Sequence, residues 1–346
     1  MKAIKVYDVD DIRLEDIPVP EIGPRDALVE MRRCGICTGD VTPWYIRRKA
    51  PIVIGHEPAG VISAVGSEVE DHRPGDRVFV HHHAPCFRCR LCQRGHYTLC
   101  ETWKASHLDP GAIAEYVRIP EINLRNDTLG IPDSMSYDDA ALIEPVACSV
   151  KAVERAGIKP GDIVLIVGLG FMGQLNGILA KHYGAKQVIG TDMVPYRLQK
   201  ALDFGMDAVI NAGVEDVTGT VSELTDGIMA DVVIVGPGSI SAMKSGLSCA
   251  GKGARVLFFM STPEEDVLDL RPFDLYFKEI TLLSSYSCGP GDTHAARDLI
   301  NAGIISAEKV VTHRFPIEDT EIGYRLTADA GESLKSLICI ADDDPL

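Results

Sequence analysis

Apolar and polar residues alternate in short segments through the first 149 residues of the chain. Three such segments are ALVEMRR (27–33), AGVISAVG (59–66) and DRVFVHH (76–82). A period of two is typical of strands with one buried face, and the Pro and Gly residues between the segments indicate turns. We therefore predict a β-rich domain over residues 1–149.

From residue 150 onward the pattern changes to continuous apolar runs separated by segments of helical period. The runs, typical of strands buried on both faces, are DIVLIVG (162–168), QVIGTD (187–192), ADVVIVG (230–236), ARVLFFM (254–260) and EITLLSS (279–285). Helical segments at 172–184 and 197–205 lie between them. Strands that alternate with helices predict a parallel sheet covered on both sides, so we expect a doubly wound α/β domain over residues 150–286.

The last segment, residues 287–346, is too short for a domain of its own. Its pattern predicts one helix (THAARDLINAG, 293–303), a loop, and a final strand (LKSLICIAD, 334–342). We expect this tail to pack back on the first segment, so that residues 1–149 and 287–346 form one domain.

Composition and charge narrow the class of protein. The chain has 346 residues, with 34 basic and 50 acidic side chains and a net charge of −16. This charge argues against nucleic acid or a membrane as partner, because both attract clustered Lys and Arg. No apolar run reaches the length of a membrane span, and the start of the chain lacks the apolar core of a secretory signal. We expect a cytoplasmic protein whose ten cysteines stay reduced.

The loop after the first apolar run has the spacing G-x-G-x-x-G, in the stretch IVLIVGLGFMG. It follows a predicted strand, opens a predicted helix, and is followed by Asp192, 22 residues after Gly170. This combination predicts a dinucleotide whose pyrophosphate lies at the helix N-terminus. Asp192 would accept hydrogen bonds from the ribose and repel a 2′-phosphate, which favours NAD over NADP. The predicted cofactor-binding residues are Gly168, Leu169, Gly170, Phe171, Met172, Gly173, Asp192 and Arg197.

Four cysteines lie close together in residues 84–100, with the spacing C-x2-C-x2-C-x7-C. They are Cys86, Cys89, Cys92 and Cys100. Four thiolates can surround one Zn²⁺ tetrahedrally and leave no position for a substrate, so we expect a structural zinc that stabilises this lobe. Two disulfides and an iron–sulfur cluster are the alternatives. A reducing compartment counts against the first, and the cysteine spacing without a following Pro counts against the second.

A second group of potential ligands has a different chemistry. CGIC (34–37) supplies Cys37, and IGHEPAG (54–60) supplies His56, with a carboxylate from Glu57 or Glu144. Mixed sulfur, nitrogen and oxygen ligands with one position left open are typical of a catalytic zinc. Asp40 would orient the His56 ring. The alternative, a C-x-x-C redox pair, lacks the strand–helix context of such motifs.

Together these stretches resemble the zinc-dependent medium-chain dehydrogenase/reductase family over essentially the whole chain. The matching stretches are CGIC, GHEPAG, VGSEVEDHRPGDRV, the four-cysteine lobe, AEYV, ALIEPVACS and GLGFMG. The resemblance implies a GroES-like catalytic domain (1–149 and 287–346), a Rossmann NAD-binding domain (150–286), two zinc ions per chain and a homotetramer or homodimer. It also implies Cys37, His56 and either Glu57 or Glu144 on the catalytic zinc.

Glu144 stands where classical alcohol dehydrogenases carry a cysteine, which is similar to the polyol (sorbitol/xylitol) and threonine dehydrogenase branch. This implies an enzyme that interconverts a polyol-like secondary alcohol and a ketone by hydride transfer to NAD. The alternatives are an L-threonine 3-dehydrogenase or a specialised hydroxy-substrate dehydrogenase. A catalytically silent, structural or regulatory NAD-binding protein is the alternative of another class.

One stretch departs from the family pattern CGIC-G-[ST]-D-x-H. In CGICTGDVT, Thr38 comes one position early, Gly39 takes the hydroxyl position, and Thr42 replaces the histidine. We therefore expect the proton relay at Thr38, at Thr42 or within His81–His83.

Overall fold

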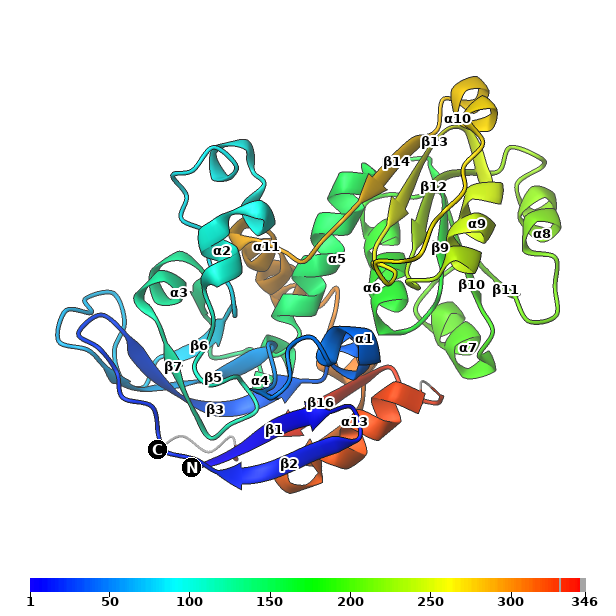
Figure 1. The fold of residues 1–346 in the computed structure, drawn as a ribbon. Coiled ribbons are helices and arrows are strands. Elements are labelled where there is room, and N and C mark those ends of the chain that lie inside the picture. Colours follow the sequence, from blue (N-terminus) through cyan, green and yellow to red (C-terminus); the bar gives the residue numbers. More distant parts are fainter. Residues whose placement is uncertain (330, 343–346) are drawn as a thin grey trace. The chain divides into compact units, whose positions relative to one another are not determined.

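The structure is a computed structural model that describes residues 1–329 and 331–342. The chain divides into two compact units (Figure 1). Unit one comprises residues 1–147 and the described part of 288–346, and unit two comprises residues 148–287. The division falls within α5 (Ile143–Ala156).

Two β-sheets form the framework of unit one. The larger sheet contains β3 (Ala27–Gly35), β5 (Pro58–Val65), β6 (Arg77–Val80), β7 (Tyr116–Ile119), β8 (Thr128–Gly130), β15 (Val311–Pro316) and β16 (Lys335–Cys339). Its order is β15-β16-β3-β5-β6-β8, with β7 also paired to β3. The smaller sheet contains β1 (Lys2–Asp8), β2 (Asp11–Asp16) and β4 (Ile52–Val53). The strands predicted at 27–33, 59–66 and 76–82 are confirmed as β3, β5 and β6.

The alternating pattern of β3 explains its central place in the larger sheet. Ala27, Val29 and Met31 are buried in one apolar core together with Ile4 and Ile62. Because alternate residues of a strand share a face, this core fixes the register of β3. β3 ends at Gly35, two residues before Cys37, so the register of the strand also sets the position of that cysteine.

Short helices connect these strands. They are η1 (Thr38–Val41), α1 (Pro43–Ile46), η2 (Cys92–Arg94), η3 (Tyr97–Leu99), α2 (Glu101–Ala105), α3 (Glu121–Asn126), α4 (Tyr137–Ala140), α11 (Pro290–Asn301), α12 (Ala307–Val310), η4 (Ile317–Asp319) and α13 (Thr320–Asp329). No helix in the described chain is long and apolar enough to cross a bilayer.

The tail differs in part from its sequence prediction. The predicted helix and final strand are confirmed as α11 and β16, and β16 pairs with β3 as expected for a tail that returns to the first segment. The loop predicted between them is wrong, because it contains α12, β15, η4 and α13. β15 reads VTHRFP, whose polar residues hide its strand pattern, and parallel pairing with β16 stabilises it.

Unit two is built on a six-stranded parallel sheet. Its strands are β9 (Ile163–Val167), β10 (Gln187–Asp192), β11 (Ala208–Asn211), β12 (Ala230–Val235), β13 (Ala250–Phe258) and β14 (Thr281–Ser284). The order is β11-β10-β9-β12-β13-β14, so the direction of winding reverses between β9 and β12. Ligands of such sheets bind beyond the carboxyl ends of the strands at this reversal, where the glycine loop follows β9. The five predicted strands are confirmed, and β11 is additional.

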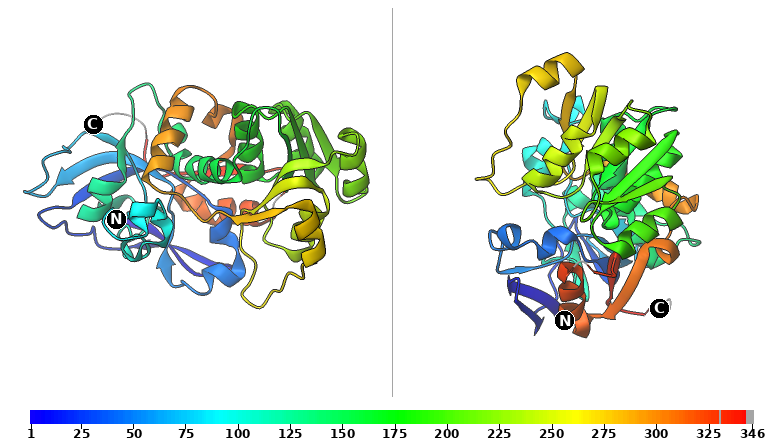
Figure 2. Two further views of the ribbon diagram at one scale, coloured as in Figure 1. Left: turned by 90° about the horizontal axis from the view of Figure 1, so that it is seen from above. Right: turned by 90° about the vertical axis from the view of Figure 1, so that its right-hand side faces the viewer.

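Helices pack along this sheet (Figure 2). They are α6 (Phe171–His182), α7 (Pro195–Asp203), α8 (Val217–Leu224), α9 (Ile240–Ser248) and α10 (Pro272–Lys278). α6 and α7 contact each other and the strands β9 to β11, whereas α9 contacts α8, β9, β12 and β13. The predicted doubly wound, Rossmann-type sheet is thereby confirmed.

Gly173 supplies a test of this architecture, because α6 approaches the glycine loop most closely there. A Cβ atom at Gly173 would overlap with the carbonyl oxygen of Gly168, a backbone atom that cannot rotate away. We predict that Gly173→Ala lowers the free energy of unfolding by about 1–3 kcal/mol, as measured by urea titration. The control is Gly291→Ala in α11, since a Cβ atom at Gly291 meets nothing within 4 Å. Equal losses in the two variants would contradict the close approach.

Candidate active site

Four cysteines of unit one form a closed cluster beside η2, η3 and α2. The sulfur of Cys92 lies 4.0 Å from that of Cys86 and 3.5 Å from that of Cys89, and the sulfur of Cys100 lies 3.6 Å from that of Cys86. Thiolates on a tetrahedral zinc have sulfurs about 3.8 Å apart. Backbone N–H groups of Arg88 and Cys89 lower the pKa of Cys86 to about 6, which favours the thiolate. The cluster therefore fits one zinc ion and leaves no place for a substrate.

A second donor group, here called the open site, lies where the loops after β3 and β4 meet. The sulfur of Cys37, a ring nitrogen of His56 and a carboxylate oxygen of Glu57 lie within 4.8 Å of one another. Cys37 precedes η1, and its sulfur accepts the N–H of Gly39 at 3.3 Å. A carboxylate oxygen of Asp40, on η1, is 3.4 Å from Nδ1 of His56. This contact is an ion pair rather than a hydrogen bond, and it leaves the other ring nitrogen for a ligand. These donors fit a zinc ion with mixed ligands.

The charges around the open site oppose the cost of burial. Burial lowers the pKa of His56, but the negative charges of Asp40 and Cys37 outweigh it and raise that pKa well above its ordinary value. At Asp40, burial outweighs the neighbouring His56, so the pKa of this carboxyl group is raised. The site is therefore arranged to hold positive charge.

Glu57 is anchored by a buried cation. Its carboxylate forms an ion pair with Lys335 of β16, and the two side chains are 1% and 2% exposed. The same ammonium group donates to the carbonyl oxygen of Ile36 at 2.9 Å. Sequence reasoning missed Lys335, because 278 residues separate it from Glu57.

The other predicted acid, Glu144, occupies a different group. It lies buried on the first turn of α5, and its carboxylate is within 4.8 Å of ring nitrogens of His81 and His82. The ring of His82 is in turn 5.0 Å from that of His56, measured between centroids. The structure thus brings both acids to the neighbourhood of His56 but places Glu57 alone within the open site.

Of the predicted relay residues, Thr38 and Thr42 lie on η1 and directly after it, whereas His81 is fully buried. Thr38 is exposed on η1. The hydroxyl of Thr42 donates to the carbonyl oxygen of Thr38 at 2.9 Å, so it is committed to the backbone.

The glycine loop of unit two is held by hydrogen bonds to Asp192, at the end of β10. One carboxylate oxygen accepts the N–H of Leu169 at 2.7 Å, and the other accepts the N–H of Val194 at 2.9 Å. Gly168 adopts a positive φ of 85°, which non-glycine residues disfavour, and Gly170 precedes the first turn of α6. A guanidinium nitrogen of Arg197 lies 3.8 Å from a carboxylate oxygen of Asp192. The predicted loop, acid and arginine therefore come together at one end of the sheet.

Gln174 supports this loop and was not predicted. Its buried side-chain amide donates to the carbonyl oxygens of Leu169 and Arg197, both at 2.9 Å. A glutamine in the first turn of a predicted helix gives no signal of such a role.

Comparison with known proteins agrees with both units. Residues 23–132 match the family described as "Alcohol dehydrogenase GroES-like domain", and residues 172–302 match "Zinc-binding dehydrogenase". The predicted GroES-like and Rossmann combination is confirmed.

Two relatives match over nearly the whole chain. The chain is 31% identical to sorbitol dehydrogenase of Bacillus subtilis (strain 168), over 93% of this chain and 92% of that protein. It is 35% identical to L-threonine 3-dehydrogenase of Symbiobacterium thermophilum, over 94% and 93%. A short chain alcohol dehydrogenase from Escherichia coli CFT073, solved in complex with NADH, has a TM-score of 0.87 at 27% identity and covers 98% of this chain and 99% of that one.

The buried ion pair provides a test of the site's framework. Lys335→Met leaves the Glu57 carboxylate buried without this cation, so we predict a loss of about 3–5 kcal/mol in the free energy of unfolding, measured by urea titration. The double variant with Glu57→Gln should recover much of the loss, because it buries neither charge. The control Lys2→Met breaks an exposed ion pair with Glu318 and should cost little. Similar losses in the two lysine variants would argue against a buried pair.

Proposed function

Since this chain belongs to the zinc-dependent medium-chain dehydrogenase/reductase family, we propose that it interconverts a polyol-like secondary alcohol and a ketone with NAD as hydride acceptor. The observation that carries the proposal is the open site, where a thiol, an imidazole and a carboxylate lie within 4.8 Å of one another. Such a mixed donor set is typical of catalytic zinc and differs from the closed four-cysteine cluster. Similarity to a sorbitol dehydrogenase supports the polyol.

We assign two zinc ions per chain to these groups. One belongs to Cys86, Cys89, Cys92 and Cys100, and one belongs to Cys37, His56 and Glu57. Glu144 is the alternative acid for the second ion. When bound at the open site, zinc supplies stabilisation of the negative charge that develops on the alcohol oxygen. Cys37 and the acid would contribute the negative charge that holds the ion, and Asp40 would keep the His56 ring in position. Thr38, beside Cys37 and exposed, is the proposed relay residue, whose hydroxyl would accept the proton of the alcohol while it passes its own proton to water; Thr42 and His81–His83 are the alternatives.

We assign NAD binding to residues 150–286 and catalysis to residues 1–149 and 287–346. Bound NAD supplies the hydride-accepting ring. N–H groups at the start of α6 would face the pyrophosphate. A carboxylate has about four lone-pair sites, so Asp192 keeps two for ribose hydroxyls beyond the two N–H groups it accepts. A homotetramer or homodimer and a cytoplasmic location remain predictions.

L-threonine is the second candidate substrate. The relative with this activity shares 35% identity with the chain. A threonine carboxylate needs a cation close to the reacting carbon, and Lys49, whose ammonium donates to the hydroxyl of Tyr45 at 2.6 Å, is the proposed one. Lys49→Met should therefore separate the two substrates, because it would weaken threonine binding and leave polyol binding unchanged.

The decisive assay follows reduction of NAD or NADP by absorbance with a panel of polyols, L-threonine, simple secondary alcohols and cyclic alcohols. We predict reduction of NAD, with polyols as the best class. Reduction by threonine alone would assign the second candidate. Absence of reduction across the panel, by protein that carries its zinc, would contradict the proposed alcohol–ketone chemistry.

Cys37→Ser tests the assignment of the open site. The substitution removes the thiolate donor, so we predict loss of turnover and of one zinc equivalent, with NAD affinity unchanged in a fluorescence titration. Cys249→Ser in unit two, which replaces a buried thiol outside the donor groups of the described chain, is the control. A parallel loss of NAD affinity in Cys37→Ser would count against separate metal and cofactor sites.

A further inference from the structure

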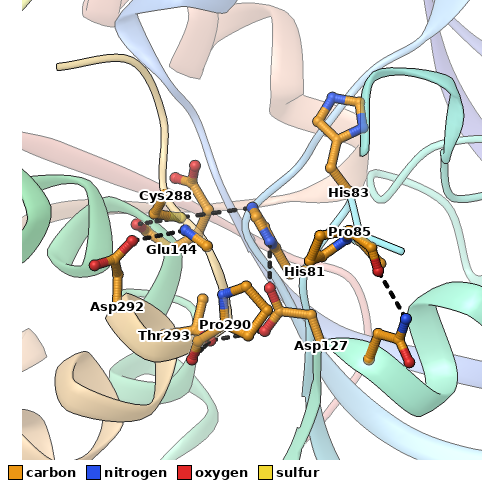
Figure 3. A network of polar contacts seen from close by, with 12 residues as sticks. His81, His83, Pro85, Asp127, Glu144, Cys288, Pro290, Asp292 and Thr293 are labelled. Atoms are coloured by element: carbon orange, nitrogen blue, oxygen red, sulfur yellow. Dashed lines mark hydrogen bonds and ion pairs between the residues drawn. The ribbon is translucent and has the colours of Figure 1, made fainter. Parts of the chain in front are cut away.

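Three consecutive histidines, residues 81–83, follow the end of β6, and polar contacts hold the outer two (Figure 3). Nδ1 of His81 lies 2.7 Å from a carboxylate oxygen of Asp127. Nδ1 of His83 lies 2.5 Å from the carbonyl oxygen of Ser106. These contacts fix the residues on both sides of His82, so they also restrict where its ring can lie.

The middle histidine has a polar atom that its surroundings do not satisfy. Nδ1 of His82 is buried and has no hydrogen-bond partner in the part of the chain that the structure describes. The ring contacts other aromatic rings, with its centroid 4.2 Å from that of His83 and 6.4 Å from that of Trp103. A buried polar atom without a partner costs free energy, so a ligand that supplies a hydrogen bond to it gains affinity.

The ring of His82 lies against the open site. Its centroid is 5.0 Å from that of His56, a distance at which two rings are in contact. One of its nitrogens lies within 4.8 Å of a carboxylate oxygen of Glu144, the alternative acid for the zinc of the open site. His82 as a whole is only partly buried, so part of its ring is accessible. A substrate that reaches the open site can therefore contact His82.

We propose that His82 binds the hydroxyl group next to the reacting carbon of the substrate and thereby selects vicinal diols over simple secondary alcohols. A hydroxyl group both donates and accepts, so it can pair with Nδ1 in either tautomer of the ring. L-Threonine carries an ammonium group on the adjacent carbon, which can only donate. A simple secondary alcohol leaves Nδ1 unpaired. This inference rests on the proposed function and names the residue that recognises its substrate class.

Kinetics with two kinds of alcohol test this role. The substrates are sorbitol, which carries neighbouring hydroxyl groups, and isopropanol, which carries a single one. His82→Phe keeps a ring but removes both nitrogens, so we expect kcat/KM for sorbitol to fall by about 10–100-fold and that for isopropanol to stay unchanged. His82→Asn should retain most of the sorbitol activity, because its amide group also donates and accepts. The control is His107→Phe, which replaces an exposed histidine beside His83 and should change neither value.

Three results with His82→Phe would overturn the inference. An equal fall with both substrates would indicate a proton relay or a structural role, and an unchanged value for sorbitol would show that the ring does not recognise the diol. Loss of a zinc equivalent, measured by inductively coupled plasma mass spectrometry, would make the ring a metal ligand. The proposed function would survive each of these results, because it fails only if the wild type oxidises no alcohol of the panel.

Substrate binding gives a readout that does not depend on turnover. The wild type is labelled with nitrogen-15 at histidine and saturated with zinc and NADH, which cannot accept a hydride. Sorbitol should shift the Nδ1 resonance that is missing from the spectrum of His82→Phe, and isopropanol should leave that resonance in place. A resonance that sorbitol does not move, in a complex that binds sorbitol, would contradict the hydrogen bond to His82.

Discussion

The donor atoms of unit one are positioned by contacts between buried carboxylates and histidine rings. Asp40 orients His56, and Asp127 orients His81. A buried charge is expensive unless it is paired, so each carboxylate restricts its histidine to one orientation. The ion pair of Glu57 and Lys335 acts in the same way, because a shift of either side chain would leave a charge buried alone. The donor atoms are therefore arranged before any ion binds.

Unit two positions its loop by close packing rather than by buried charge. Every residue of β9 is buried, so the strand delivers the glycine loop at a fixed place. At Gly173 only a hydrogen fits between α6 and the loop, and Asp192 ties the loop to the next strand through the N–H of Leu169. The same carboxylate faces the position that the fingerprint assigns to the ribose. One residue thus links the geometry of the loop to the choice of cofactor.

Local features of this structure could be predicted from the sequence, and distant ones could not. The four cysteines lie within 15 residues, so their spacing alone indicates a closed cluster, and the glycine loop is equally compact. By contrast, His81 and Cys288 are 207 positions apart, and Lys335 reaches Ile36 across 299 positions. Only the pairing of β16 with β3 brings Lys335 to the open site. The run of three histidines at 81–83 is conspicuous in the sequence, but its contacts depend on Asp127 and Glu144, which no local pattern connects to it.

The proposed function depends on an open, mixed-ligand zinc site that is distinct from the four-cysteine cluster. The most direct measurement is diffraction from crystals of the zinc-loaded protein at wavelengths on either side of the zinc absorption edge. We expect an anomalous peak between Cys86, Cys89, Cys92 and Cys100 and a separate peak between Cys37 and His56, both lost below the edge. A peak at the four cysteines with none beside Cys37 and His56 would contradict it.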